Sequence, residues 1–207
     1  MNIVFDFGAV LFTWQPATLV AQHFPQLAAT PGQAQQLAQA IFNHGDWHGF
    51  DSGTVALDEV IGLTASRLDL AHETLHGALA PIGEQLAPIA CNVEMLSRLH
   101  EQRSRHGGLK LYFLSNMPTP YARALERRHD FLQWFDGGIF SGDVKLAKPD
   151  PAIFRLLASR YQLGSTETLF IDDSLVNVKA ADALGWQTIH CEVPERLPGQ
   201  LMAKLGL

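Results

Sequence analysis

The sequence predicts an α/β fold in which a Rossmann-like parallel sheet carries an inserted all-helical cap subdomain. An apolar run at residues 3–5 opens the chain, and from about residue 92 similar short runs alternate with helical segments, as in βαβ units. Between these parts, residues 15–90 show helical periodicity and no convincing strand. We therefore assign residues 1–14 and 91–207 to the core and residues 15–90 to the cap.

Three helices are expected within the cap. Apolar residues from Ala34 to Phe42 recur at the i, i+3, i+4, i+7 spacing of an amphipathic helix. A second stripe runs from Leu57 to Leu68 and carries acidic residues in its first turn, which the helix dipole favours. A shorter helix around Leu75 and Leu79 is bounded by Pro81. This pattern predicts a helical subdomain after the first strand.

Capping signals place the helices of the core. Thr119 precedes Pro120 and Asp150 precedes Pro151, so each is expected to cap a helix that has proline at its first position. Gly185 is expected to end the helix that follows Asp173, because glycine readily adopts the left-handed conformation found at helix ends.

Composition is typical of a globular protein. The 207 residues are 47% hydrophobic and 17% charged, with a net charge of −6, which disfavours nucleic acid and anionic membranes as partners. Two cysteines lie far apart and indicate reduced thiols. No secretion signal precedes the first strand, and no apolar run is long enough to span a bilayer. We expect a cytoplasmic protein.

Polar residues follow the apolar runs at several points. Because a parallel sheet gathers its strand ends at one edge, these residues are expected to converge on one site. They are Asp6, Ser115, Asn116, Lys148, Asp172 and Asp173. A nucleophilic carboxylate, a hydroxyl and amide pair, a lysine and two further carboxylates together form a site suited to phosphate and a metal ion.

These residues resemble the four motifs of the haloacid dehalogenase superfamily of hydrolases, in order. The motifs read Asp6-Phe7-Gly8-Ala9-Val10, Ser115-Asn116, Lys148, and Asp172-Asp173 followed by Asn177. Within the superfamily the chain resembles small phosphatases with a helical C1-type cap, such as sugar-1-phosphate phosphatases and the phosphatase domain of mammalian epoxide hydrolases. The resemblance implies a core with a cap inserted between the first two motifs. It aligns Asp173 with the principal acidic metal ligand and Asp172 with a secondary position.

Phosphate-ester chemistry suggests a role for each residue. Mg²⁺ would be held by Asp6, Asp172, Asp173 and the backbone carbonyl of Gly8. Asp6 would attack phosphorus to form an aspartyl-phosphate, which water then hydrolyses. Ser115, Asn116 and Lys148 would bind the phosphate oxygens, Lys148 acting catalytically. Its neighbour Lys145 is interpreted as a solvent-facing lysine, and Asn177 either contacts the metal through water or is a polar helix residue.

Gly8 departs from the family pattern. Most phosphatases of this family carry a second aspartate two residues after the nucleophile, where it acts as general acid and base. A glycine cannot protonate the leaving oxygen. Three explanations stay open: the substrate has a good leaving group, a cap residue (His44 or His48) or ordered water supplies the proton, or the protein catalyses poorly and binds its ligand instead.

The segment between residues 43 and 53 is the most unusual part of the cap, being rich in glycine, aromatic and titratable residues. It is either a connecting loop with a buried Trp47 or a specificity loop in which His44 and Trp47 contact the substrate. The histidine pairs 44/48 and 72/76 have helical spacing but no third ligand, so they make a poor zinc site.

We therefore expect an Mg²⁺-dependent hydrolase of small phosphorylated metabolites, with sugar phosphates among the candidate substrates. Two alternatives stay open. A 2-haloacid dehalogenase would use the same nucleophile on carbon without magnesium, and a phosphometabolite-binding protein would keep the fold without turnover.

Overall fold

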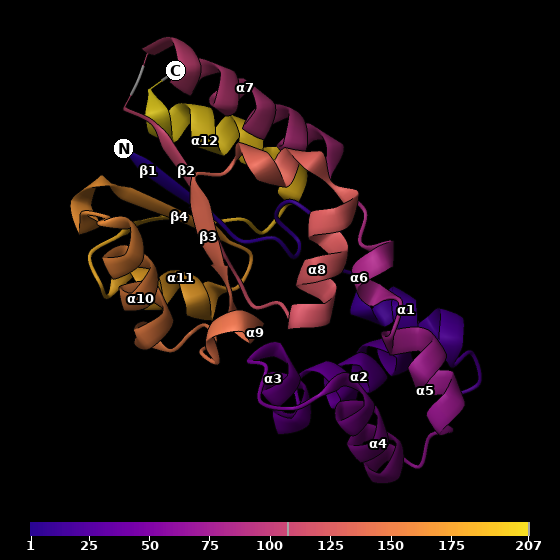
Figure 1. Ribbon diagram of the computed structural model, residues 1–207. Coiled ribbons are helices and arrows are strands. Elements are labelled where there is room, and N and C mark those ends of the chain that lie inside the picture. Colours follow the sequence, from indigo (N-terminus) through magenta and orange to yellow (C-terminus); the bar gives the residue numbers. More distant parts are fainter. Residues whose placement is uncertain (107, 207) are drawn as a thin grey trace.

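A parallel five-stranded sheet forms the centre of the molecule, as expected (Figure 1). The structure is a computed structural model that describes residues 1–106 and 108–206. The sheet order is β3-β2-β1-β4-β5. The strands are β1 (Asn2–Phe5), β2 (Lys110–Ser115), β3 (Gly137–Phe140), β4 (Thr168–Asp172) and β5 (Gln187–His190).

The central strand β1 is buried on both faces. Ile3 lies between Leu111 of β2 and Leu169 of β4, and all three side chains are fully buried. Ile3 and Phe5 point into one apolar cluster, whereas Val4 points into a second cluster on the opposite face. A strand that is apolar on both faces requires helices on both sides of the sheet.

Helices cover the two faces unequally. One cluster joins the sheet to α7 (Ala90–His106), α8 (Thr119–Arg128) and α12 (Leu197–Leu205), and the other to α10 (Pro151–Tyr161) and α11 (Leu175–Asp182). The remaining short helices of the core are α9 (Ser141–Val144), η1 (Asp130–Trp134), η2 (Ser165–Glu167) and η3 (Pro194–Arg196). Within the described part of the chain, no helix is both long and apolar enough to cross a membrane.

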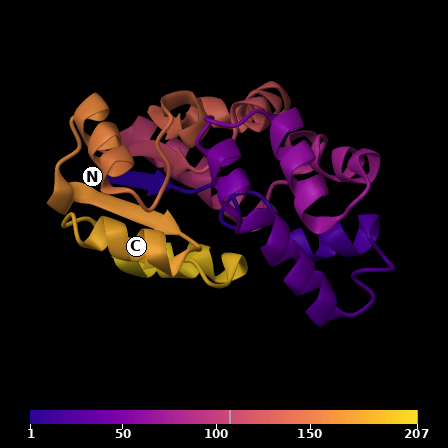
Figure 2. The ribbon, with the colours of Figure 1, turned by 90° about the horizontal axis from the view of Figure 1, so that it is seen from below.

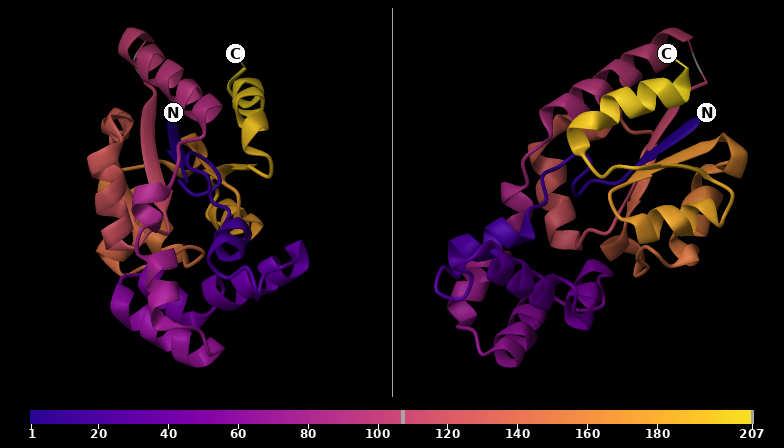
Figure 3. Two further views of the ribbon diagram at one scale, coloured as in Figure 1. Left: turned by 90° about the vertical axis from the view of Figure 1, so that its right-hand side faces the viewer. Right: turned by 180° about the vertical axis from the view of Figure 1, so that it is seen from behind.

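The inserted helices form a lobe at one end of the sheet, away from both termini (Figures 1, 2 and 3). Residues 15–90 contain no strand. Their helices are α1 (Pro16–His23), α2 (Pro31–Phe42), α3 (Gly45–Asp51), α4 (Leu57–Leu68), α5 (His72–Leu79) and α6 (Ile82–Gln85). We call α1–α6 the cap. The predicted domain boundaries at residues 14 and 91 stay a prediction, because the segments that connect the core to the cap belong clearly to neither.

Two antiparallel segments connect the cap to the core. The amide of Thr13 donates to the carbonyl of Ala87 (2.8 Å), and the amide of Ile89 donates to the carbonyl of Leu11 (2.8 Å). The cap also packs against the core through α6 and α8, where a Cβ added at Gly83 would lie 2.6 Å from the Cα of Tyr121. The cap therefore contacts the core directly and not only through its linkers.

The capping predictions fare differently. Asp150 caps α10, since its side chain accepts the amide of Ala152, and Gly185 (φ +79°) ends the turn after α11. The expected cap at Thr119 is wrong. The residue lies inside α8, with Pro118 at the N-cap position, and its hydroxyl donates to Asp143 (3.1 Å). A tertiary contact with α9 thus replaces the local capping bond.

The segment between residues 43 and 53 is a helix rather than a connecting loop. α3 buries Trp47 and Phe50, and the Nδ1 atom of His44 accepts the amide of Asp46 at its start. Two glycines in seven residues disfavour a helix intrinsically. Burial of two large aromatic side chains stabilises it instead.

Candidate active site

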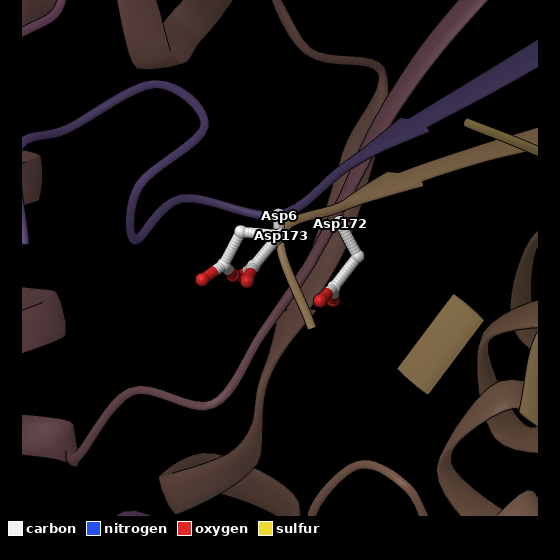
Figure 4. A group of neighbouring side chains, drawn as sticks. All are labelled: Asp6, Asp172 and Asp173. Atoms are coloured by element: carbon white, nitrogen blue, oxygen red, sulfur yellow. The ribbon is translucent and has the colours of Figure 1, made fainter. Parts of the chain in front are cut away.

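Three carboxylates meet at the carboxyl edge of the sheet (Figure 4). Asp6 directly follows β1, Asp172 is the last residue of β4, and Asp173 comes next. One oxygen from each lies within 4.8 Å of the others. The central position of β1 beside β4 causes this convergence, because both strands end at the same level of the sheet.

Lys148 reaches the same cluster from the loop between α9 and α10. Its ammonium group lies 3.0 Å from Oδ1 of Asp6 and 2.6 Å from Oδ2 of Asp172, and it donates to the carbonyl of Leu114 (2.8 Å). The side chain is only 1% exposed. Lys145, by contrast, is exposed, as the sequence indicated.

Asn116 fixes the backbone of Lys148. Its side-chain amide donates to the carbonyl of Lys148 (2.9 Å) and accepts the amide of Lys148 (2.8 Å). This reciprocal pair sets the direction from which the lysine enters. Ser115 precedes Asn116, is buried, and lines the cavity described below.

Asp172 is held by its neighbours, whereas the other two carboxylates are more open. The Asp172 oxygens accept hydrogen bonds from the amide of Ser174 (2.8 Å) and the side chain of Asn177 (3.1 and 3.2 Å) as well as from Lys148. In the described chain no other residue donates a hydrogen bond to Oδ2 of Asp6 or to the Asp173 carboxylate. Asn177 thus orients Asp172.

Burial and crowding perturb the charges of the cluster. Burial, with a smaller contribution from Asp172 and Asp173, raises the pKa of Asp6 to about 7, although Lys148 opposes this shift. Burial and the charge of Asp172 raise the pKa of Asp173. Burial alone would lower the pKa of Lys148, but the charges of Asp172 and Asp6 outweigh it and raise this pKa. One ammonium group faces three carboxylates, and a site of this kind favours a second cation.

The cluster fits a divalent metal ion. Carboxylate oxygens are the ligands that Mg²⁺ prefers, and the open oxygens of Asp6 and Asp173 face the cavity that Gly8 also lines. We name Asp6, Asp173, Asp172 and the Gly8 carbonyl as the residues that would hold it. Asp172 is the least available of these, because Lys148 and Asn177 already occupy its oxygens.

A cavity of about 220 Å³ opens above the carboxylates, between core and cap. Polar side chains of the core form its floor, and apolar and aromatic side chains form most of its wall. The floor comprises Asp6, Ser115, Asn116 and Asp173. The wall comprises Trp14, Phe42, Trp47, Ile82, Leu86, Met117, Pro118 and Tyr121, with Asn43 and Asp51 as its polar members.

The aromatic wall is a connected set of edge-to-face contacts. Ring centroids are 5.2 Å apart from Trp14 to Phe42, 4.6 Å from Phe42 to Trp47, and 5.4 Å from Trp47 to Phe50. Phe50 then contacts Tyr121 of the core at 5.3 Å. These contacts favour one arrangement of the rings and give the cavity a preformed apolar side.

The cap candidates separate into two groups. Trp47 is buried and lines the cavity, whereas His44 and His48 are exposed and lie outside the lining. The His44 ring pairs instead with Asp46 (2.8 Å). Sequence reasoning missed Asp51, which lines the cavity from the end of α3. Its only sequence signal is its place four residues after Trp47, which is one helical turn.

The chain is similar to several known proteins. A model of the family described as haloacid dehalogenase-like hydrolases matches residues 3–185. The sesquiterpene phosphatase astK of Aspergillus oryzae is 28% identical over 194 residues, which cover 90% of this chain and 87% of that protein. The drimenol cyclase drtB of Aspergillus calidoustus is 26% identical over 205 residues, and the chain spans 36% of its length.

A solved structure shares the fold. It is the HAD family enzyme bt-2542 of Bacteroides thetaiotaomicron, determined in complex with magnesium and inorganic phosphate. The TM-score is 0.69 at 21% identity, covering 91% of this chain and 92% of that chain.

Proposed function

Because the chain belongs to the haloacid dehalogenase-like hydrolases, and is therefore a hydrolytic enzyme, we propose that it hydrolyses phosphate monoesters with Mg²⁺ through an aspartyl-phosphate on Asp6. One observation carries this proposal. The Asp6 carboxylate combines one oxygen held by Lys148 with a second oxygen that no described residue occupies, at the floor of the cavity between core and cap.

The residues of the floor and their neighbours share the steps of the reaction. The free oxygen of Asp6 attacks phosphorus, while Lys148 and the Ser115 hydroxyl stabilise the equatorial phosphate oxygens. A bound Mg²⁺ would supply charge neutralisation that lets two anions approach. Asn116 positions Lys148, and Asn177 positions Asp172. Water then attacks the phosphorylated Asp6 and releases inorganic phosphate.

The cavity wall favours an apolar leaving alcohol over a sugar. Sugar hydroxyls need hydrogen-bond partners when they are buried, and the wall offers aromatic rings and aliphatic groups at most positions. The sesquiterpene phosphatase among the relatives is consistent with this preference. We therefore propose a phosphate ester of a small aromatic or branched aliphatic alcohol.

The dehalogenase alternative explains the site less well. Displacement of halide from carbon requires no metal, yet the three carboxylates are gathered within 4.8 Å around one lysine. In a protein that only binds a phosphometabolite, the open oxygen of Asp6 would have no role. Hydrolysis of a phosphate monoester uses both features.

The direct test measures phosphate release with and without Mg²⁺. We expect the wild type to release phosphate from 4-nitrophenyl phosphate with Mg²⁺ and to stop in EDTA. Asp6→Asn should retain the fold and lose turnover, because an amide cannot attack phosphorus. Asp182→Asn, an exposed aspartate at the end of α11, is the matched control and should retain full activity. Turnover by Asp6→Asn, or chloride release from 2-chloropropionate in EDTA, would contradict the proposal.

A further inference from the structure

The floor of the cavity lacks a proton donor for the leaving oxygen, since Gly8 has no side chain. We propose that Asp51 of the cap is the catalytic general acid and base, protonating the leaving alcohol and then deprotonating the attacking water. This inference rests on the proposed phosphatase function and adds a residue that no family motif provides.

The cavity holds few groups that could serve. Its titratable lining residues are Asp6, Asp51, Tyr121 and Asp173. Asp6 is the nucleophile, and Asp173 belongs to the metal cluster. The Tyr121 hydroxyl already donates to the carbonyl of Leu79 (2.6 Å), and burial, followed by the charge of Asp51, raises its pKa above its usual value. Asp51 is the remaining candidate.

The Asp51 carboxyl is available for chemistry although its backbone is anchored. In the described chain no residue donates a hydrogen bond to this carboxyl. Its carbonyl accepts the Ser141 hydroxyl of the core. Two residues later, a Cβ added at Gly53 would overlap the carbonyl oxygen of Gly142. The core therefore holds the end of α3 in place while the side chain of Asp51 faces the cavity.

Burial favours the protonated form of the Asp51 carboxyl. Burial is the largest cause and the charge of Asp6 adds to it, so the pKa of Asp51 rises to about 8 although Lys148 opposes the shift. A carboxyl that carries its proton at neutral pH can donate it to a developing alkoxide.

The proposed steps balance. As Asp6 attacks, the phosphorus–oxygen bond to the alcohol breaks, and the alcohol oxygen takes the Asp51 proton. The resulting Asp51 carboxylate then takes a proton from water as that water attacks the aspartyl-phosphate. The bond between phosphorus and Asp6 breaks, inorganic phosphate leaves, and Asp51 is protonated again.

The test compares esters that differ in their need for a proton. Cyclohexylmethyl phosphate releases a poor leaving group, whereas 4-nitrophenyl phosphate releases one that needs no proton. For Asp51→Asn we expect kcat/KM to fall by about 10²–10⁴-fold on the first ester and to change little on the second. Loss of the base should also produce a burst of 4-nitrophenol, because the aspartyl-phosphate accumulates.

Asp46→Asn is the matched control. Asp46 lies on the same helix but pairs with His44 and Arg67 outside the cavity lining, so this variant should keep both rates. An equal loss on both esters in Asp51→Asn would indicate a merely structural role and overturn the proposal, as would no loss on either.

The wild type provides a readout that does not depend on how the variant folds. Its kcat/KM should vary little across aryl and alkyl phosphates of rising leaving-group pKa, and a steep dependence would overturn the role of Asp51. If the wild type hydrolyses no phosphate monoester, or Asp6→Asn still turns over, the phosphatase proposal itself has failed.

Discussion

Lys148 shows how strongly a single residue can be constrained. Its ammonium group contacts two buried carboxylates and a carbonyl, and the Asn116 side chain holds its backbone. A buried ion pair contributes little net stability compared with an apolar pair, but removing one partner leaves uncompensated charge. The lysine is thus needed for the integrity of the site, and we propose that it also binds phosphate.

We expect Lys148→Met to lower the free energy of unfolding by about 3–5 kcal/mol, because Asp6 and Asp172 lose their shared cation. Urea denaturation in EDTA at neutral pH measures the change. The control Lys145→Met replaces an exposed lysine in the same loop and should stay within about 0.5 kcal/mol of the wild type. Equal stability of the two variants would show that the buried carboxylates need no cation.

Among the elements, α3 departs most from what its sequence suggests. This segment is helical because Trp47 and Phe50 are buried and because its end contacts α9, and not because its residues have a high helix propensity. The contact depends on Gly53, whose φ of +70° and close approach to Gly142 exclude a side chain.

Gly53→Ala should therefore destabilise the protein by at least about 1 kcal/mol, since alanine is strained in the left-handed region and its Cβ meets the Gly142 carbonyl. Gly62→Ala is the matched control. Gly62 lies inside α4 with open space at its Cβ position, so alanine should stabilise by about 0.5–1 kcal/mol. Thermal unfolding of both variants compares them, and a stabilised Gly53→Ala would disprove the close contact of cap and core.

At the scale of the molecule, the proposed function depends on the cavity that core and cap share. The core supplies the charged floor, and the cap supplies Phe42 and Trp47 of the aromatic wall. Parallel sheets commonly place reactive groups at the carboxyl ends of their strands, while an inserted lobe excludes water and selects the substrate.

Two esters of similar shape test whether the apolar wall of the cavity selects the substrate. Cyclohexylmethyl phosphate and glucose 6-phosphate are both primary alkyl phosphates on a six-membered ring, but only the sugar carries ring hydroxyls. We expect kcat/KM to favour the cyclohexyl ester by about 10-fold or more, because each buried hydroxyl without a partner costs about 1–3 kcal/mol. Trp47→Ala should reduce this preference. A preference for the sugar would restore the sugar-phosphate expectation.

The sequence by itself determined the parallel core, the inserted helices and the family, and the family match confirms the last of these. It also located the residues that converge at the strand ends, such as Asp6 and Lys148, although their roles stay proposals. These features follow from local periodicity and from motifs, because parallel strands place their ends along one edge.

Only the tertiary structure decided which cap residues face that edge. Trp47 and Asp51 line the cavity, whereas His44 and His48 lie outside its lining. Most of the segment between residues 43 and 53 forms the helix α3. Local sequence could not determine these placements, because they depend on packing between segments distant in the chain. The contact of Ser141 with Asp51 spans 90 residues and fixes how the end of α3 meets the core.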